Sequence, residues 1–189
     1  MIRIAVVGDI GSGKSHIAKF FNYPIFNADL EVAKIYKTNK QCFKNLKKKL
    51  PNHFLSFPIQ KEEIIKAISY NKTNLKKITS IIHPEIRKKM KIFLKHNRKK
   101  DAVILDIPLL LENRLNQKGD VIIFIQSKKT EVIKRLKKRK NFNLDIFNKF
   151  KKIQLPLIFK KEKSQFIIKN NFTNKSVKMD IQKILKKIL

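Results

Sequence analysis

The chain has 189 residues, 42% of them hydrophobic, and its 45 Lys and Arg against 14 Asp and Glu give a formal net charge of +31. This length and apolar content predict a single domain, residues 1–189, with a sizeable core. The longest apolar runs are too short to span a bilayer and no signal-peptide pattern follows the first residues, so we expect a cytoplasmic protein without membrane contact. The lone Cys42 excludes an internal disulfide and is interpreted as a buried, idle thiol.

The positive charge is spread along the whole chain instead of being gathered in one tail. Few of the basic residues are arginines, and aromatic residues are not interleaved with them in one stretch. Sites for nucleic acids depend on arginine contacts and on aromatic stacking. We therefore expect no specific nucleic-acid partner, although the positive field would attract any phosphate-rich small molecule.

The first element is an apolar run over residues 2–7, which predicts a strand buried on both faces. It runs into GDIGSGKS at 8–15, the pattern of a phosphate-binding loop between a strand and a helix. In such a loop Lys14 reaches the β- and γ-phosphates and the Ser15 hydroxyl binds Mg²⁺. The alternative is a glycine-rich turn without a ligand. The expected ATP-binding residues are Gly8, Gly11, Ser12, Gly13, Lys14, Ser15 and His16.

A helix is expected from Ile17 onward, and the short apolar segment 24–26 predicts a second strand with Asp29 at its C-terminal end. Ligands of open α/β sheets bind at that end of the strands, so the Asp29 carboxylate is expected beside the phosphate loop. The structural alternative is that Asp29 caps the helix that follows.

Residues 30–97 show helical periodicity, with a loop over 51–58. Separate helices are predicted near 75–82 and 86–94, joined at His83-Pro84, because proline suits a first helical turn. A helical block of this length between two strands exceeds a simple crossover. It is interpreted as a substrate-holding insertion, with extra structural helices as the alternative.

The chain returns to a strand over 102–105 that ends on Asp106, where a second carboxylate on the Mg²⁺ side of a phosphate-loop enzyme is expected. Another apolar strand follows at 121–125, and a helix over 130–139 places Arg135 and Arg139 on one face.

Residues 140–163 are polar, basic and broken by Pro156, which indicates either a mobile flap or a basic hairpin on the surface. A last strand at 166–168 and a closing amphipathic helix over 177–188 complete the pattern. Alternating strands and helices predict a three-layer α/β fold with a mainly parallel, five-stranded sheet.

Taken together, these segments resemble the dephospho-coenzyme A kinase family over essentially the whole chain. The resemblance implies a phosphate-loop kinase fold with a core of about 1–29, 98–139 and 165–189, a coenzyme-binding helical region of about 30–97 and a lid of about 140–164. It also implies a monomer that uses ATP and Mg²⁺ to phosphorylate the ribose 3′-hydroxyl of dephospho-coenzyme A. The matching segments are 8–15, NAD at 27–29, HP at 83–84, DIPLLLE at 106–112, Arg135, Arg139, Gln154 and IKNN at 168–171.

The same resemblance implies roles for single residues. Asp29 would face the acceptor hydroxyl, and Lys14 and the lid cation Arg139 would offset charge on the transferring phosphoryl group. Acceptor contacts are implied for His83, Pro108 and Leu109, and Mg²⁺ contacts for Ser15 and Asp106. The departures from the family pattern are Asp9 and Phe172 at usual glycines, His16 at a usual threonine and Ser164-Gln165 at a usual Ala-Asp.

Two other functions stay open at this point. A kinase for a different small acceptor, such as a nucleoside monophosphate, would share the loop and lid but not the 106–112 segment in this form. A nucleic-acid-binding ATPase would use the +31 charge directly, and its hydrolysis would be stimulated by nucleic acid with a steep salt dependence.

Overall fold

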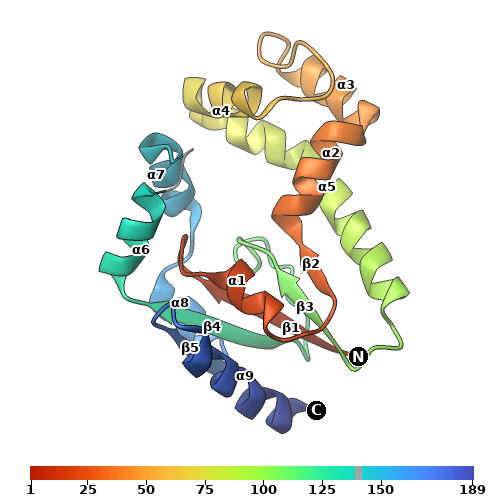
Figure 1. Ribbon diagram of the computed structural model, residues 1–189. Coiled ribbons are helices and arrows are strands. Elements are labelled where there is room, and N and C mark those ends of the chain that lie inside the picture. The colour runs from red at the N-terminus through yellow and green to blue at the C-terminus, as the bar shows by residue number, and fades with distance from the viewer. Residues whose placement is uncertain (139–141) are drawn as a thin grey trace.

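The computed structural model describes residues 1–138 and 142–189. A single sheet with the strand order β2-β3-β1-β4-β5 forms the centre, and all of its strand pairs are parallel. Helices cover both faces of this sheet, and a helical block rises from one end of it (Figure 1). The predicted three-layer α/β fold is therefore confirmed. The strands are β1 Ile2–Gly8, β2 Ile25–Asn27, β3 Ala102–Asp106, β4 Val121–Ser127 and β5 Phe166–Asn170.

The helices form where apolar residues recur at helical spacing and can be buried against the sheet or against each other. Among the described residues, no helix is both long and apolar enough to cross a membrane. The helices are α1 Lys14–Lys19, α2 Ala28–Thr38, α3 Lys40–Lys49, α4 Lys61–Tyr70, α5 Lys72–His96, α6 Lys129–Lys137, α7 Leu144–Ile153, α8 Leu157–Glu162 and α9 Asn174–Ile188.

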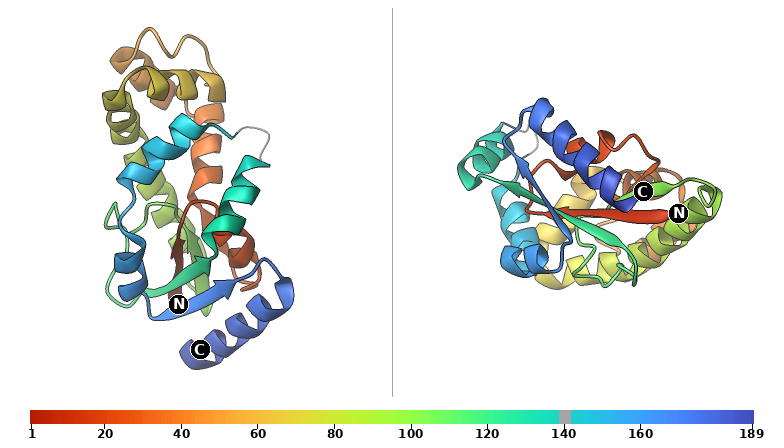
Figure 2. Two further views of the ribbon diagram at one scale, coloured as in Figure 1. Left: turned by 90° about the vertical axis from the view of Figure 1, so that its left-hand side faces the viewer. Right: turned by 90° about the horizontal axis from the view of Figure 1, so that it is seen from below.

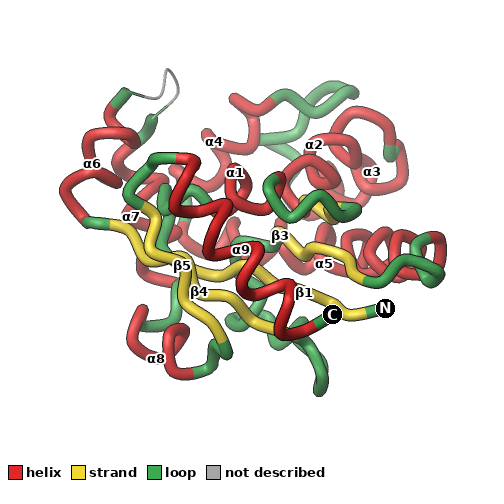
Figure 3. The backbone as a smooth tube through the Cα atoms, turned by 60° about the horizontal axis from the view of Figure 1, so that its bottom comes forward, coloured by secondary structure: helices red, strands yellow, loops and turns green. Residues whose placement is uncertain are grey.

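The core has two parts, one on each face of the sheet. On one face α1 and α9 cover the sheet, with Phe21 and Ile181 fully buried against strand residues such as Ile4; Figure 3 shows α9 crossing over β5, β4 and β1. On the other face Phe124 and Leu105 pack under the helical block of α2 to α5. Strands whose two faces are both covered read as continuous apolar runs, which is why they were predictable.

Strand register brings the functional segments to one edge of the sheet. Asn27 lies opposite Asp106, and Gly8 lies opposite Ile125. Because all strands run in the same direction, their C-terminal ends meet at this edge, below the helical block (Figures 1 and 2). The loops that follow β1, β2, β3 and β4 are thereby neighbours.

The prediction of two helices joined at His83-Pro84 is wrong, because α5 runs unbroken from Lys72 to His96 with Pro84 inside it. Proline removes the bond to the carbonyl four residues earlier, that of Ser80. Ser80 and Pro84 are both exposed, so water can satisfy the free carbonyl. The rest of the helix is held by burial of Ile78, Ile82 and Ile86.

Two stretches held more helix than their composition indicated. Helix α3 lies within the predicted helical block, but no separate helix was located there because lysines surround its few apolar residues, of which Cys42 and Leu46 are buried. The Cys42 thiol is free and buried as predicted, and burial raises its pKa to about 11. The stretch interpreted as a flap or hairpin contains α7 and α8, separated by Pro156.

Candidate active site

The phosphate-loop segment forms a tight turn between β1 and α1. Gly8, Gly11 and Gly13 all have positive φ angles. A Cβ on Gly13 would lie 2.5 Å from Asn170 Nδ2, and one on Gly8 would lie 2.7 Å from the Ile125 carbonyl oxygen. Only glycine fits these positions, and the resulting cradle of main-chain N–H groups suits an anion such as a nucleotide phosphate.

Two side chains from neighbouring strands fix the loop. Ser127 Oγ and Asn170 Nδ2 donate hydrogen bonds to the Ser12 carbonyl oxygen at 3.0 and 2.8 Å. Asn170 Oδ1 also accepts a bond from the Phe172 N–H, which ties the loop after β5 to the phosphate loop. Sequence reasoning assigned no role to Ser127 or Asn170, because their meeting with Ser12 depends on strand order.

Lys14 is buried and its Nζ is turned back onto the loop. It donates to the Asp9 carbonyl oxygen at 2.7 Å and lies 3.4 Å from that of Gly8. Burial, and secondly the Lys160 charge, lower its pKa to about 8, while nearby Asp106, Asp9 and Asp29 oppose the shift. Burial disfavours the charged form of Lys14, and a strongly anionic ligand bound to the loop N–H groups would favour it.

The predicted position of Asp29 at the end of β2 is wrong. The strand ends at Asn27, and Asp29 lies in the first turn of α2. The helix is capped by Asn27, whose Oδ1 accepts from the Leu30 N–H at 2.8 Å. The alternative role of Asp29 as the cap is therefore excluded. Desolvation and secondly the Asp106 charge raise the pKa of Asp29, and Lys14 opposes the rise.

Asp106 ends β3 as predicted and is buried with 2% of its surface exposed. Its Oδ2 accepts a hydrogen bond from Asn27 Nδ2 at 2.5 Å. Asn27 thereby orients Asp106 and caps the helix that carries Asp29. The structure brings Lys14, Asp29 and Asp106 close enough for their charges to affect one another, as the sequence predicted.

Lys160 is a buried cation that sequence reasoning missed. Only 1% of its surface is exposed, and its Nζ pairs with Glu112 Oε1 at 2.6 Å. The same oxygen accepts a hydrogen bond from the Leu155 N–H at 3.1 Å. Glu112 thus fastens the start of α8 to the loop after β3, and Lys160 adds positive charge near Lys14. Among so many lysines, no local pattern marks Lys160 as a buried one.

Four other predicted site residues lie on α1 and in the turn after β3. Ser15 and His16 are exposed on α1, and His16 Nε2 lies 3.1 Å from Asn174 Oδ1 at the start of α9. Pro108 and Leu109 are partly buried in the turn that follows Asp106. Their roles in binding stay predictions.

Of the remaining predicted residues, His83 and Arg135 lie on helices. His83 is partly buried within α5, where burial and then the Arg87 charge lower its pKa. Arg139 lies outside the described residues. Arg135 stacks on the Phe172 ring, with its guanidinium carbon 4.3 Å from the ring centroid.

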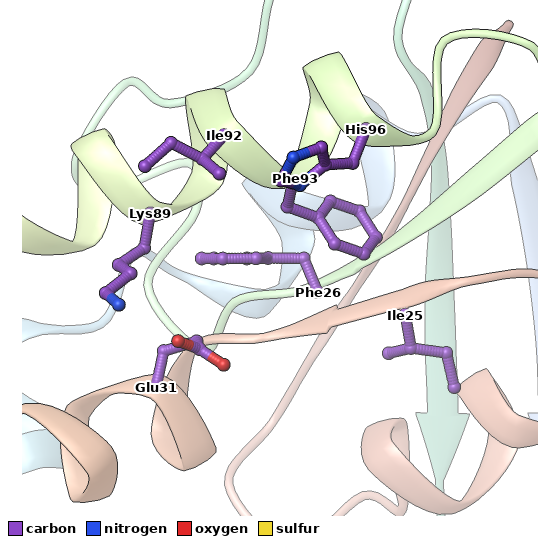
Figure 4. A pocket seen from close by; sticks show the side chains of 7 residues that line it. All are labelled: Ile25, Phe26, Glu31, Lys89, Ile92, Phe93 and His96. Atoms are coloured by element: carbon purple, nitrogen blue, oxygen red, sulfur yellow. The ribbon is translucent and has the colours of Figure 1, made fainter.

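A separate pocket of about 220 Å³ lies between β2, α2 and the end of α5 (Figure 4). The Phe26 and Phe93 rings lie side by side there, tilted by 52° with centroids 5.5 Å apart. Glu31 and Asp29 are two residues apart in α2, so they leave the helix about 200° apart. The pocket is therefore distinct from the cluster around Asp29. Its lining residues are Ile25, Phe26, Glu31, Lys89, Ile92, Phe93 and His96.

The donor set fits a nucleotide phosphate and one Mg²⁺. Lys14 and the loop N–H groups suit the phosphates, while Ser15 in the first turn of α1 offers a hydroxyl and Asp106 at the end of β3 offers a carboxylate. The described residues hold no group of three or more His, Cys, Asp or Glu arranged to bind a metal. Mg²⁺ often keeps several waters and binds through one or two protein oxygens together with substrate phosphates, so a sparse set is sufficient.

Comparison with known proteins agrees with this geometry. The family model for dephospho-CoA kinase matches residues 2–176. A dephospho-CoA kinase from Wolbachia sp. subsp. Brugia malayi is 29% identical over 96% of this chain and 95% of its own length. Among solved structures, TT1252 from Thermus thermophilus has a TM-score of 0.78 at 21% identity, covering 100% of this chain and 98% of its own.

A second solved structure, the dephospho-CoA kinase from Campylobacter jejuni, has a TM-score of 0.64 at 22% identity and covers 98% of this chain and 96% of its own. At these identities the two structures establish likeness of fold. The family follows from the match of the family model to nearly the whole chain, together with a phosphate loop that adjoins two carboxylates. This chain belongs to the dephospho-CoA kinase family.

Proposed function

We propose that this chain transfers the γ-phosphoryl group of ATP to the ribose 3′-hydroxyl of dephospho-CoA, giving CoA and ADP in the last step of CoA biosynthesis. Membership of the family supports the reaction. The structural observation that carries the proposal is the buried Lys14 in a glycine cradle with Asp29 and Asp106 beside it. This arrangement holds a polyphosphate and offers a carboxylate to an acceptor hydroxyl.

In this mechanism the loop N–H groups and Lys14 hold the phosphates of ATP and offset charge that spreads onto the transferring group. Ser15 and Asp106 would hold Mg²⁺, which would supply positive charge to offset that of the phosphates. Asn27 keeps the Asp106 carboxylate in place through the bond to its Oδ2. Anion binding also raises the pKa of Lys14, so the lysine is fully charged in the complex.

Asp29 accepts the proton of the 3′-hydroxyl. A carboxylate whose pKa is raised above its ordinary value, as that of Asp29 is by desolvation and by the Asp106 charge, is a stronger base than an unperturbed one. Because phosphoryl transfer passes through a loose transition state, proton transfer is needed late. Orientation of the hydroxyl in line with the γ-phosphorus is then the larger part of the Asp29 contribution.

The remaining assignments follow the family resemblance. The helical block of residues 30–97 binds the acceptor, with His83, Pro108 and Leu109 contacting it. Residues 140–164 serve as the lid, and Arg139 supplies a lid cation. The chain acts as a cytoplasmic monomer on small molecules, without a membrane or a specific nucleic acid as partner.

The test is release of ADP with and without dephospho-CoA, in a coupled assay with Mg²⁺ present. The proposal predicts that ADP release depends on dephospho-CoA and on Mg²⁺ and is not replaced by nucleoside monophosphates. Turnover with a nucleoside monophosphate alone would favour the other small-acceptor kinase. Hydrolysis stimulated by DNA or RNA would favour the nucleic-acid-binding ATPase.

A further inference from the structure

Asp9 connects the phosphate loop with α7. Its Oδ1 accepts a hydrogen bond from the Ile10 N–H at 2.7 Å and forms an ion pair with Lys151 Nζ at 2.6 Å. Its main-chain oxygen accepts the bond from Lys14 Nζ at 2.7 Å. One residue of the loop therefore holds two ammonium groups, one from the loop itself and one from α7.

Helix α7 has little else to fix its position. None of its residues, 144–153, is buried, although Ile146 packs partly against the core. Its other polar anchor is Lys149, whose Nζ donates to the carbonyl oxygens of Ile68 at 2.7 Å and Ser69 at 3.1 Å. These carbonyls belong to the last turn of α4, where a cation is favoured. Helix α7 thus lies between α4 and the phosphate loop (Figure 2, left), and two lysines of its C-terminal half, Lys149 and Lys151, tie it to them.

The Asp9–Lys151 pair has little value for the stability of the fold. The Lys151 side chain is 42% exposed and that of Asp9 22% exposed. A pair as open as this contributes about 1 kcal/mol or less to stability. Its position matters more, because an unpaired carboxylate at Asp9 would repel the phosphates that the loop is built to hold.

We propose that Lys151 is a positioning residue for ATP, held over the phosphate loop by Asp9 in the free protein and transferred to the β- and γ-phosphates when ATP binds. The Asp9 carboxylate then stands in for a phosphate oxygen until the nucleotide arrives. Lys151 shares the Asp9 Oδ1 with the Ile10 N–H, whereas a phosphate offers several charged acceptor oxygens. Transfer of Lys151 from Asp9 to the phosphates therefore favours nucleotide binding. This inference rests on the ATP-dependent reaction proposed above.

A simpler role for Lys151 would be to neutralise Asp9 and nothing more. The two roles differ when Asp9 has already lost its charge. If Lys151 only masks Asp9, its removal has no effect on ATP binding once Asp9 is replaced by Asn. If Lys151 contacts the phosphates, its removal weakens ATP binding in that background as well.

The experiment compares ATP dissociation constants from calorimetry at low ionic strength for the full-length wild type, Asp9→Asn, Lys151→Gln and the double variant. We expect Asp9→Asn to bind ATP more tightly than wild type, because the Asp9 carboxylate no longer competes with the phosphates for Lys151. Adding Lys151→Gln to Asp9→Asn should weaken binding about tenfold, the loss of one charge-assisted hydrogen bond. Lys152→Gln is the matched control, since it removes the same charge from the neighbouring exposed position of α7 and should change affinity less than about twofold.

Kinetics and a conservative variant complete the test. Lys151→Gln should raise the KM for ATP more than it lowers kcat, and Lys151→Arg should restore most of the affinity. Equal affinities of the Asp9→Asn and double variants, with wild-type melting temperatures, would overturn the inference. If the wild-type protein bound no ATP at all, the proposed function itself would be contradicted. If the wild type bound and turned over ATP normally but Lys151→Gln left the ATP affinity of Asp9→Asn unchanged, only this inference would be contradicted.

Discussion

Replacing Asp29 by Asn removes the carboxylate that we place at the acceptor hydroxyl and retains a side chain of nearly the same shape. The helix does not lose its cap, because Asn27 caps α2. An acidic residue in a first helical turn contributes about 0.3–1 kcal/mol through the helix dipole. Desolvation of Asp29 and its repulsion by Asp106, which raise its pKa, act against that gain. The melting temperature should therefore stay close to that of wild type.

The catalytic effect of Asp29→Asn should be large by comparison. Loss of a positioned general base lowers rates by about 10²- to 10⁴-fold, and the loose transition state of phosphoryl transfer places the expected loss near 10². The assay is kcat for ADP release with saturating dephospho-CoA, with the ATP dissociation constant measured in parallel and expected to be unchanged. The wild-type rate should also fall as pH decreases through the raised pKa of Asp29, because protonation removes the acceptor, and Asp29→Asn should lose this dependence.

The matched control is Glu31→Gln. Glu31 lies in the same helical turn and carries the same charge, but it leaves α2 on the other side and pairs with Lys34 at 2.6 Å. It should keep kcat within about twofold of wild type, because Glu31 points away from the Lys14 cluster and its partner Lys34 is open to solvent. Wild-type turnover by Asp29→Asn, or equal losses in both variants, would refute the role given to Asp29.

Three further outcomes are expected. Lys14→Met should nearly abolish transfer without lowering the melting temperature of the free protein at pH 7, because burial disfavours the lysine charge there. In the wild type, the destabilisation due to that charge should fade as pH rises through about 8 toward 10.5, and KM for ATP should rise over the same range. Glu112→Gln should destabilise the protein by about 3–5 kcal/mol in urea unfolding because it leaves Lys160 buried without its counter-ion, whereas Glu112→Gln with Lys160→Met should recover much of the loss. DNA should bind without sequence preference and dissociate as salt increases, and a salt-resistant, sequence-selective site would contradict the reading of the +31 charge as diffuse.

The parts of the fold predicted from sequence are those with one dominant local signal. The strands β1, β3 and β4 are almost purely apolar, so periodicity located them within one or two residues. The phosphate loop was predictable because glycine at 8, 11 and 13 meets a steric need that the structure confirms. Asp106 and Asp29 were each expected at the phosphate loop, and both lie near Lys14 there.

What could not be predicted depends on contacts between distant segments. Asn27 was passed over as a cap in favour of Asp29 because both are good capping residues and only main-chain geometry decides between them. The pairs Asp9–Lys151 and Glu112–Lys160 join residues far apart in the chain, and both Lys151 and Lys160 stand beside other lysines that the sequence does not distinguish from them. The His83-Pro84 break was wrong because burial along α5 outweighs one missing hydrogen bond.

The most direct test of the account is to identify the product that the purified protein makes from ATP, Mg²⁺ and dephospho-CoA. Phosphorus NMR and mass spectrometry report both the transfer of one phosphoryl group and the hydroxyl that carries it. The account predicts CoA with its phosphate on the ribose 3′-oxygen, formed in equal amount with ADP and lost in Lys14→Met. ADP released without a phosphorylated acceptor, or a phosphate on another hydroxyl, would contradict it.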